Sequence, residues 1–444
     1  MAVSRTLVCG ALTVSFLATL SAQINSPATF LTYAQASPVF AALEQPSPAA
    51  RDWDRWIAAA DAATRARVAH GDESSVVNLL LFGTSFTVQP RITARQLNQQ
   101  QIQKAVSVRL DDFEKALASG DTNERLQLAR RLLRNAKPIR ARLLSMIDRT
   151  IQESESHARL IAQAHALGDP SLEFAERSRL YRERGLASDT SVRINFAIEE
   201  ALRGAYAKAA AAPARIQRVA VIGPGLDVVD KQEGHDFYPP QTIQPFAVVD
   251  SLIRLGLAHA DTIHVTTLDV SATVNDHIVE MGRRARAGTP YVMMLLLDGE
   301  VAWTPQLLGY FGKFGDAIGS QVPVTIPPGI GSPRLRAISV RPQVVERISA
   351  RDINITAQRL VLSDAERFDL IIGTNVFVYY DRLQQGLAMV NIADMLRPGG
   401  LLLSNNALVE VPSAGMRSIG YTKTLYSTRE EDGDLIIWYQ KAPK

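Results

Sequence analysis

Residues 368–404 constrain the fold of this chain more than any other stretch. The apolar run 369–372 suits a strand buried on both faces, and Gly373-Thr374-Asn375 follows it, where a parallel sheet opens its ligand crevice. Apolar residues then recur at helical spacing from Leu383 to Leu396, and Pro398-Gly399-Gly400 stops that helix before a second apolar run. The stretch therefore predicts a strand, a helix and a second strand of a parallel α/β sheet.

A second strand and turn lie near the middle of the chain. Val219 to Ile222 is an apolar run, and Gly223-Pro224-Gly225-Leu226-Asp227 follows it at once. A cofactor lying across a strand end needs backbone without Cβ at its closest approach, which glycine supplies. A short Gly-x-Gly is a weak signal alone, but the strand before it and the strand–helix alternation after it favour a cofactor-binding turn.

An acid ends the next predicted strand, 263–268. Asp269 suits a ribose diol, because carboxylate oxygens accept hydrogen bonds from two hydroxyl groups. The alternative is a capping role at the start of the next helix, where Ser271 and Thr273 also stand. The glycine turn and the acid occur in order within one strand–helix–strand unit, which favours the ribose role.

Residues 368–404 resemble strands four and five of class I S-adenosyl-L-methionine (SAM)-dependent methyltransferases. Within that class they are most similar to the chemotaxis-receptor methyltransferase type. The resemblance covers the C-terminal half of the chain and is carried by the run Phe368-Asp369-Leu370-Ile371, the pair Asn375-Val376, the triplet Tyr379-Tyr380-Asp381 and the run Leu396-Arg397-Pro398-Gly399-Gly400.

This resemblance implies a fold, a cofactor and a set of contacts. The fold is a doubly wound, Rossmann-like α/β sheet with an antiparallel terminal hairpin, preceded by an all-α N-terminal domain, and the cofactor is SAM. The methyl acceptor, a small molecule or a protein, stays open, as does the oligomeric state, because fold and cofactor do not fix them. The implied contacts are Gly223, Pro224, Gly225 and Asp227 at the methionine part, Asp269 at the ribose, and Asn375 and Val376 beside the methyl group.

Two positions depart from the resembling family. Val221 stands where the family usually has an acid, and Asp227 replaces the third small residue of the glycine motif. Two hypotheses follow: an active methyltransferase in which Asp227 substitutes for the acid, or an exported, non-catalytic relative that binds a nucleotide-like ligand or a protein. A nicotinamide-dependent oxidoreductase is disfavoured, because Gly225 and Asp269 lie farther apart than the dinucleotide fingerprint allows.

The C-terminus predicts a hairpin of two strands, 420–428 and 435–441, around the turn 430–433. The resemblance implies such a hairpin, with its last strand inserted antiparallel. Three apolar runs are candidates for the third main strand of the sheet, and the sequence does not choose among them. Those runs are 291–297, 335–340 and 353–362.

Patterning divides the chain into four parts. Residues 1–22 are a predicted signal peptide, and residues 23–49 are rich in Ser, Pro, Ala and Thr and predict an irregular lead-in. Helical periodicity predicts a helical domain over 50–212. The methyltransferase-like domain then spans 213–444, with an aromatic- and glycine-containing insertion at about 299–334 that suits a substrate lid, a dimer contact or a small subdomain.

The first 22 residues carry a short basic region at Arg5, an apolar run from Thr6 to Leu20 and the small-residue site Leu20-Ser21-Ala22. These features predict export, periplasmic or secreted, with a cytoplasmic protein as the alternative, and no membrane span in the mature chain. The only cysteine, Cys9, lies in this segment, so the mature chain would have no disulfide, thiol nucleophile or thiolate zinc site. We expect no metal site, and the net charge of +3 indicates no nucleic-acid partner.

Three loops could reach the crevice. Phe82 to Thr87 is faintly similar to the loop with which the N-terminal domain of receptor methyltransferases reaches the cofactor, although a plain connection between helices is favoured. Asp230 to Thr242 is long for a strand–helix turn and could fold over the crevice. Arg184 to Ser191 could cap the following helix or line the substrate side.

Overall fold

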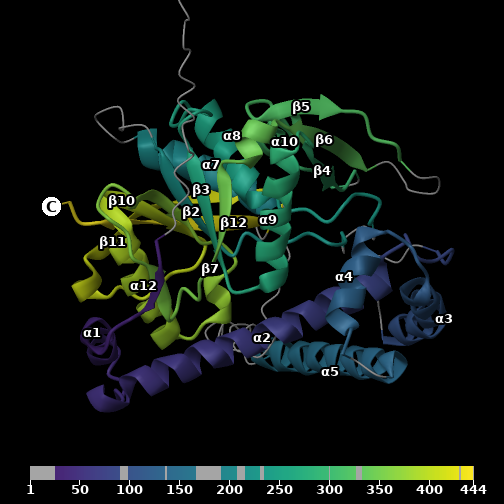
Figure 1. Ribbon diagram of the computed structural model, residues 1–444, viewed down its shortest axis with the longest axis horizontal. Helices are drawn as coiled ribbons and strands as arrows, with labels where there is room; N and C mark the ends of the chain where they lie inside the picture. The colour runs from purple at the N-terminus through teal and green to yellow at the C-terminus, as the bar shows by residue number, and fades with distance from the viewer. Residues whose placement is uncertain are drawn as a thin grey trace, which may run out of the picture.

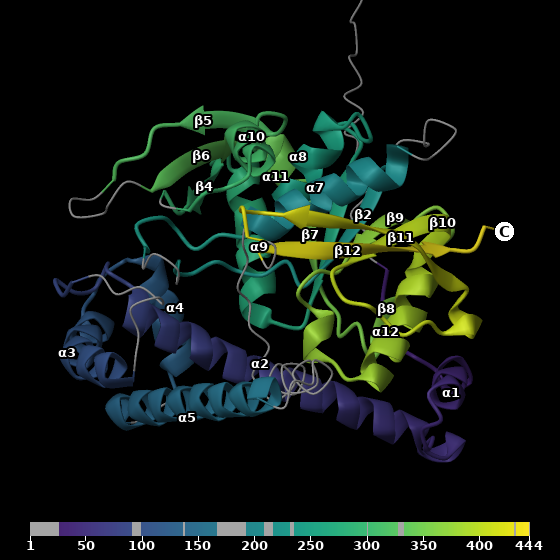
Figure 2. The same cartoon turned by 180° about the vertical axis from the view of Figure 1, so that it is seen from behind.

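The computed structural model describes residues 26–90, 99–135, 138–166, 192–207, 216–230, 235–299, 301–326, 333–429 and 432–443 (Figures 1 and 2). The predicted signal peptide 1–22 and the loop 184–191 lie outside these residues. Across the described ranges, no helix combines the length and the apolar character needed to cross a membrane. The described chain is mixed α/β, with a seven-stranded sheet, a three-stranded sheet and a group of helices packed beside them.

The seven-stranded sheet has the strand order β11-β12-β10-β9-β2-β3-β7. Neighbouring strands from β7 to β10 pair in parallel, whereas β12 is antiparallel to both β10 and β11. The mostly parallel α/β sheet predicted from the sequence is therefore confirmed. The strands are β2 (Arg218–Ile222), β3 (His264–Asp269), β7 (Ile348–Asp352), β9 (Phe368–Ile372), β10 (Leu396–Ser404), β11 (Met416–Leu425) and β12 (Gly433–Lys441).

The helices that cover the sheet are α7 (Val192–Ala207), α8 (Gln244–Arg254), α9 (Ala272–Arg286) and α12 (Arg382–Met395). Val219 and Val221 of β2 share a core with α7, α8 and α9, whereas Ala220 and Ile222 share one with α12. Successive side chains of a strand point to opposite faces, so a continuous apolar run is what a strand covered on both sides requires.

The stretch 368–404 folds as β9, the short turn η3 (Phe377–Tyr379), α12 and β10. The Asp381 carboxylate caps α12 by accepting a hydrogen bond from the Gln384 backbone N–H at 2.8 Å. Pro398-Gly399-Gly400 lies inside β10, at a register shift, and not in a turn before the strand as predicted. Gly399 has φ +77°, which interrupts the ladder as in a β-bulge while the strand continues.

The third main strand is β7, which none of the three candidate runs contains. Two of those runs form β4 (Tyr291–Leu297) and β6 (Arg334–Val340), which pair with β5 (Gly319–Val322) in the separate sheet of order β4-β6-β5. The third run turns away from the main sheet and contains β8 (Gln358–Leu360). β7 lies at the sheet edge and is mostly half-buried, so its sequence Ile-Ser-Ala-Arg-Asp lacks the apolar pattern of a central strand.

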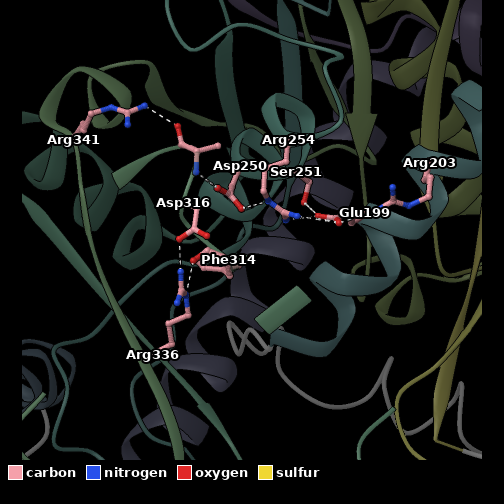
Figure 3. A network of polar contacts seen from close by, with 10 residues as sticks. Glu199, Arg203, Asp250, Ser251, Arg254, Phe314, Asp316, Arg336 and Arg341 are labelled. Atoms are coloured by element: carbon pink, nitrogen blue, oxygen red, sulfur yellow. Dashed lines mark hydrogen bonds and ion pairs between the residues drawn. The ribbon is translucent and has the colours of Figure 1, made fainter. Parts of the chain in front are cut away.

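The three-stranded sheet and α10 (Pro305–Lys313) form a subdomain that extends beyond the predicted insertion of 299–334. A buried polar network attaches it to the helices over the sheet (Figure 3). Asp250 of α8 accepts a hydrogen bond from the Ala317 backbone N–H at 3.0 Å and pairs with Arg254, which also pairs with Glu199 of α7. Both carboxylates are buried, so their charges depend on these partners.

A group of helices lies beside the sheet: α2 (Trp53–Phe82), α3 (Gln99–Ala118), α4 (Glu124–Leu133) and α5 (Ile139–Ala166). They share an apolar core that includes Leu80, Leu110 and Leu126. α2 runs along one side of the molecule from α1 toward α4 (Figure 2). The sequence grouped α7 with this helical domain, but its apolar residues Phe196 and Leu202 join the core of the sheet. The described residues also include the short helices η1 (Ala50–Asp52), α11 (Pro342–Val345) and η4 (Pro412–Ala414).

The lead-in 23–49 is more regular than its composition predicted. It contains β1 (Ala28–Phe30), which pairs antiparallel with β8, and α1 (Tyr33–Ala42). Val39 and Phe40 of α1 are buried in one cluster with Trp53 and Leu387. Tertiary burial of these few apolar residues outweighs a local composition typical of irregular chain.

Candidate functional site

The glycine turn after β2 lies at the carboxyl end of the parallel strands. Gly223 has φ +61° and Gly225 has φ +74°, a left-handed conformation that residues with a Cβ rarely adopt. The Gly223 backbone N–H donates to the Leu268 carbonyl at 3.0 Å, so the turn begins beside the end of β3. Pro224 and Leu226 are buried within the turn. The turn therefore has the left-handed glycine backbone that the sequence predicted after this strand.

Val376 explains why residue 223 must be glycine. A Cβ placed on Gly223 would come within 2.5 Å of Val376 Cγ2, closer than real Cβ atoms approach side chains. Val376 follows the end of β9, so this contact joins the ends of two neighbouring parallel strands. The structure therefore brings Gly223 and Val376, predicted from separate parts of the sequence, into direct contact.

Asp269 is the last residue of β3, on the strand next to the glycine turn. Its carboxylate accepts a hydrogen bond from the Ser271 backbone N–H at 2.8 Å, whereas Ser271 itself is the N-cap of α9. Burial raises the pKa of Asp269 to about 7, and the negative charges of Asp352 and Asp72 act in the same direction. A carboxylate has about four acceptor positions, so Asp269 retains capacity for hydroxyl donors.

Helix α2 runs along the same edge, which the sequence did not reveal. Arg65 pairs with Asp352 at 2.7 Å, and Asp352 is the register partner of Asp269. Arg67 donates to the Tyr379 carbonyl, just after β9, at 2.9 Å. Between these contacts and the end of the helix lies Asp72, whose pKa burial raises to about 6. No hydrogen bond from the described residues reaches the Asp72 carboxylate.

Asn375 stands between β9 and Val376 in a left-handed conformation, φ +59°. Its backbone N–H donates to Asn405 Oδ1 at 2.8 Å, and Asn405 Nδ2 donates back to Asn375 Oδ1 at 2.7 Å. Asn405 follows β10, so the two amides join the ends of adjacent strands. Sequence reasoning missed Asn405, although a polar residue directly after a buried parallel strand is the signal that identified Asn375 and Asp269.

Asp227, which was predicted at the methionine part of the cofactor, is half-buried and hydrogen-bonded to the segment that follows the turn. Its two carboxylate oxygens accept hydrogen bonds from Tyr238 Oη at 2.9 Å and Gln241 Nε2 at 3.0 Å. Burial raises its pKa to about 6. Gln241 also exchanges two hydrogen bonds with the backbone of Met294 in β4. Asp227 therefore helps to fix residues 235–241 against the three-stranded sheet, with one hydrogen bond on each of its oxygens.

The loop after α2 fastens the same segment from the other side. Asp236 accepts hydrogen bonds from Thr84 Oγ1 at 2.5 Å and from the backbone N–H and hydroxyl of Ser85 at 3.0 and 2.7 Å. Burial alone would raise the pKa of Asp236, but the charge of Arg125 and these hydrogen bonds hold it below its ordinary value. The Arg125 guanidinium lies 5.0 Å from the centre of the Tyr238 ring. The loop 82–87 is thus hydrogen-bonded to the segment that follows the glycine turn.

Tyr380 and Gln244 hold neighbouring elements of the sheet domain together. Tyr380 is buried in the core with α12, which raises the pKa of its hydroxyl, so its ring packs the helix. Gln244, at the start of α8, donates to Thr374 Oγ1 at 2.8 Å and holds the end of β9 to that helix.

Among the residues that the structure places, no group of three or more His, Cys, Asp or Glu side chains could hold a metal ion.

No protein-family model matches the sequence, and no curated protein does. The fold is similar to that of solved structures at low identity. The N-methyltransferase NodS from Bradyrhizobium japonicum WM9 is 12% identical with a TM-score of 0.25, over 56% of this chain and 92% of that one. The glycopeptide N-methyltransferase MtfA is 11% identical with a TM-score of 0.27, over 56% and 96%.

A third similar structure is magnesium protoporphyrin IX methyltransferase (ChlM) from Synechocystis PCC 6803, solved with bound SAM. It is 10% identical with a TM-score of 0.28, over 60% of this chain and 90% of that one.

Proposed function

We propose that this chain is a SAM-dependent methyltransferase that transfers a methyl group to an acceptor not yet identified. One observation carries the proposal: the left-handed glycine turn after β2 lies beside the carboxylate that ends β3, joined by the Gly223 N–H to Leu268 carbonyl bond of 3.0 Å. A backbone cradle next to a diol acceptor is what a nucleoside cofactor needs at the edge of a parallel sheet.

Strand order supports the same proposal. β12 is antiparallel and lies between β10 and β11, as the resemblance to class I methyltransferases implies for the terminal hairpin. A nicotinamide-dependent oxidoreductase gains no support from this arrangement. The chemotaxis-receptor type within the class is a finer proposal, and it rests on the residues of the stretch 368–404 alone.

The residues at the crevice fit SAM with one change from the sequence prediction. Gly223, Pro224 and Gly225 would hold the methionine part through the backbone, and Asp269 would accept hydrogen bonds from the ribose hydroxyls. Asn375 and Val376 would lie beside the methyl group. Asp227 is left out of this set, because Tyr238 and Gln241 occupy both of its oxygens.

SAM supplies an activated methyl group on a sulfonium, so the protein needs little acid–base chemistry. The chain would bind the cofactor, align the acceptor and exclude water. Helix α2, held to η3 through Arg67, and the segment 235–241, fastened through Asp236, would limit solvent access to a ligand at the strand ends. We also propose, from residues 1–22 alone, that the protein is exported.

Calorimetric titration of the full chain with SAM and with S-adenosylhomocysteine tests the proposal. We expect micromolar binding of both ligands, lost or strongly weakened in Asp269→Ala, and no binding of NAD. A matched control is Asp261→Ala, an exposed acid before β3. A folded protein that binds neither SAM nor S-adenosylhomocysteine would contradict the cofactor assignment and favour the non-catalytic relative.

A further inference from the structure

We propose that Asn405, Asp434 and Tyr426 are positioning residues that hold Asn375 and Val376 against the glycine turn, and so set the space in which the methyl group of SAM lies. The inference rests on the proposed function and adds to it a chain of side chains from the terminal hairpin.

The first link is the conformation of Asn375. It has φ +59° and an exposed side chain, and glycine is the residue that usually adopts this backbone geometry. Asparagine tolerates it best when local hydrogen bonds support it. An external support for residue 375 is therefore expected.

Asn405 provides that support. It accepts from the Asn375 backbone N–H and donates to the Asn375 side-chain oxygen, at 2.8 and 2.7 Å, which closes a ring between the two residues. The ring fixes both the backbone and the side chain of Asn375. It leaves the Asn375 Nδ2 group as a donor at the crevice.

Asp434 and Tyr426 fix Asn405 in turn. Asn405 Nδ2 also donates to Asp434 Oδ1 at 3.3 Å, and Tyr426 Oη donates to Asp434 Oδ2 at 2.5 Å. Tyr426 is buried, and its backbone carbonyl accepts from the Thr304 N–H at 2.9 Å, next to α10. The hydrogen bonds thus run from the buried side chain of Tyr426, beside the hairpin, to the exposed amide of Asn375 at the strand ends.

The other end of the path meets the cofactor turn. Residue 375 directs the chain so that Val376 packs on Gly223, with no space left for a Cβ there. A change in the Asn375 backbone would move Val376 relative to the glycine turn. SAM and S-adenosylhomocysteine differ by the methyl group and by the positive charge that it gives the sulfur, whereas ribose and glycine-turn contacts serve both ligands. Asn405→Ala and Tyr426→Phe remove no charge, so a shift in the relative affinity for the two ligands reports this spacing.

The test is the ratio of SAM to S-adenosylhomocysteine affinity in Asn405→Ala, measured by calorimetry on the full chain. Loss of the two neutral hydrogen bonds between Asn375 and Asn405 should weaken the affinity for SAM roughly tenfold. The affinity for S-adenosylhomocysteine should change by less than about twofold. Tyr426→Phe, which removes one hydroxyl, should shift the ratio in the same direction by less. Thermal unfolding of each variant shows whether it is folded.

A rescue variant separates positioning from general stability. Glycine adopts the left-handed conformation without support, so Asn405→Ala should change the ratio much less in an Asn375→Gly background than in the wild type. Asn406→Ala, which leaves the ring intact, should keep the wild-type ratio. Equal weakening of both ligands in Asn405→Ala, or an equal shift of the ratio by Asn405→Ala in the wild-type and Asn375→Gly backgrounds, would overturn the inference. Failure of the wild-type chain to bind either ligand would instead reject the proposed function, and the inference with it.

Discussion

Val376, just after β9, occupies the space that a side chain on Gly223, just after β2, would need. The two residues are far apart in sequence, and parallel pairing of β2 with β9 brings them together. The contact fixes the position of the Asn375-Val376 pair relative to the glycine turn at the carboxyl ends of β2 and β9.

Gly223→Ala should abolish SAM binding. The new Cβ would lie within 2.5 Å of Val376 Cγ2, and φ +61° is strained for alanine. Isothermal calorimetry measures the loss. The matched control is Gly256→Ala, because Gly256 has φ +71° but open space around its Cβ position. The control should lose stability by about 1–2 kcal/mol and keep its affinity. Equal loss of affinity in both variants would argue against the Val376 contact.

SAM affinity should rise with pH up to about pH 7. The pKa of Asp269 is raised to about 7, and hydroxyl donors favour its ionised form, so binding must displace a proton at lower pH. Each pH unit below 7 should weaken binding by up to about tenfold. Titrations between pH 5.5 and 8 in buffers of different ionisation enthalpy measure the affinity and the proton release. Asp269→Asn should bind weakly with a flat pH profile, and a wild-type affinity independent of pH would contradict the ribose role.

Asp72→Asn should stabilise the ligand-free protein at neutral pH. The folded pKa of Asp72 is raised to about 6, so the folded state holds this proton more tightly than the unfolded chain, and its contribution to the free energy of unfolding falls as pH rises through 6. The substitution should therefore add about 1–3 kcal/mol at pH 8 and much less near pH 4. Urea unfolding at both pH values measures this. Asp54→Asn, an exposed acid on the same helix, should show no such pH-dependent gain.

Asp236→Asn should release the segment 235–241. Asparagine keeps the size of the side chain but loses the charge that Thr84, Ser85 and Arg125 stabilise. Because the folded pKa of Asp236 is lowered, its contribution to stability is present at neutral pH and disappears in acid. We expect a loss of about 1–3 kcal/mol at pH 7.

Hydrogen exchange locates this effect. Amides of 235–241 and of the loop 83–87 should exchange faster in Asp236→Asn, with the β2 and β9 amides unchanged. Asp111→Asn, which breaks a surface pair with Arg140, should leave exchange in both loops as in the wild type. Faster exchange throughout the sheet would mean that Asp236 supports the whole fold and not this segment.

The central sheet was predictable because its strands are buried on both faces. Runs such as 219–222 and 369–372 are apolar enough to be identified as buried strands from local composition, and the residues after them indicate the ligand-binding edge. The edge strand β7 was not predictable in this way. Its half-buried sequence has the pattern of a loop, and only pairing with β3 makes it a strand.

Within the site, the sequence identified residues directly after strands and missed those brought in by tertiary packing. Gly223, Asp269, Asn375 and Val376 meet at one edge as expected for strand ends. Asp72 lies on a helix far away in sequence, so its place beside Asp269 follows from the packing of α2 alone. The partners of Asp227 could not be predicted, because Tyr238 and Gln241 fold back from a loop whose path the sequence does not encode locally.

The pairing of β1 with β8 bears on how this chain folds as it is made. Ala28 pairs with Leu360, so a strand synthesised early must wait for a partner made near the end of the chain. Contacts so distant in sequence form slowly, because the entropy of closing a long loop is lost before the contacts stabilise the fold. Until then α1 has no site on α12, and its apolar residues stay in solvent. Expressed from residue 213, the sheet half would lack the strand and helix that cover β8 and α12, and would expose their apolar partners.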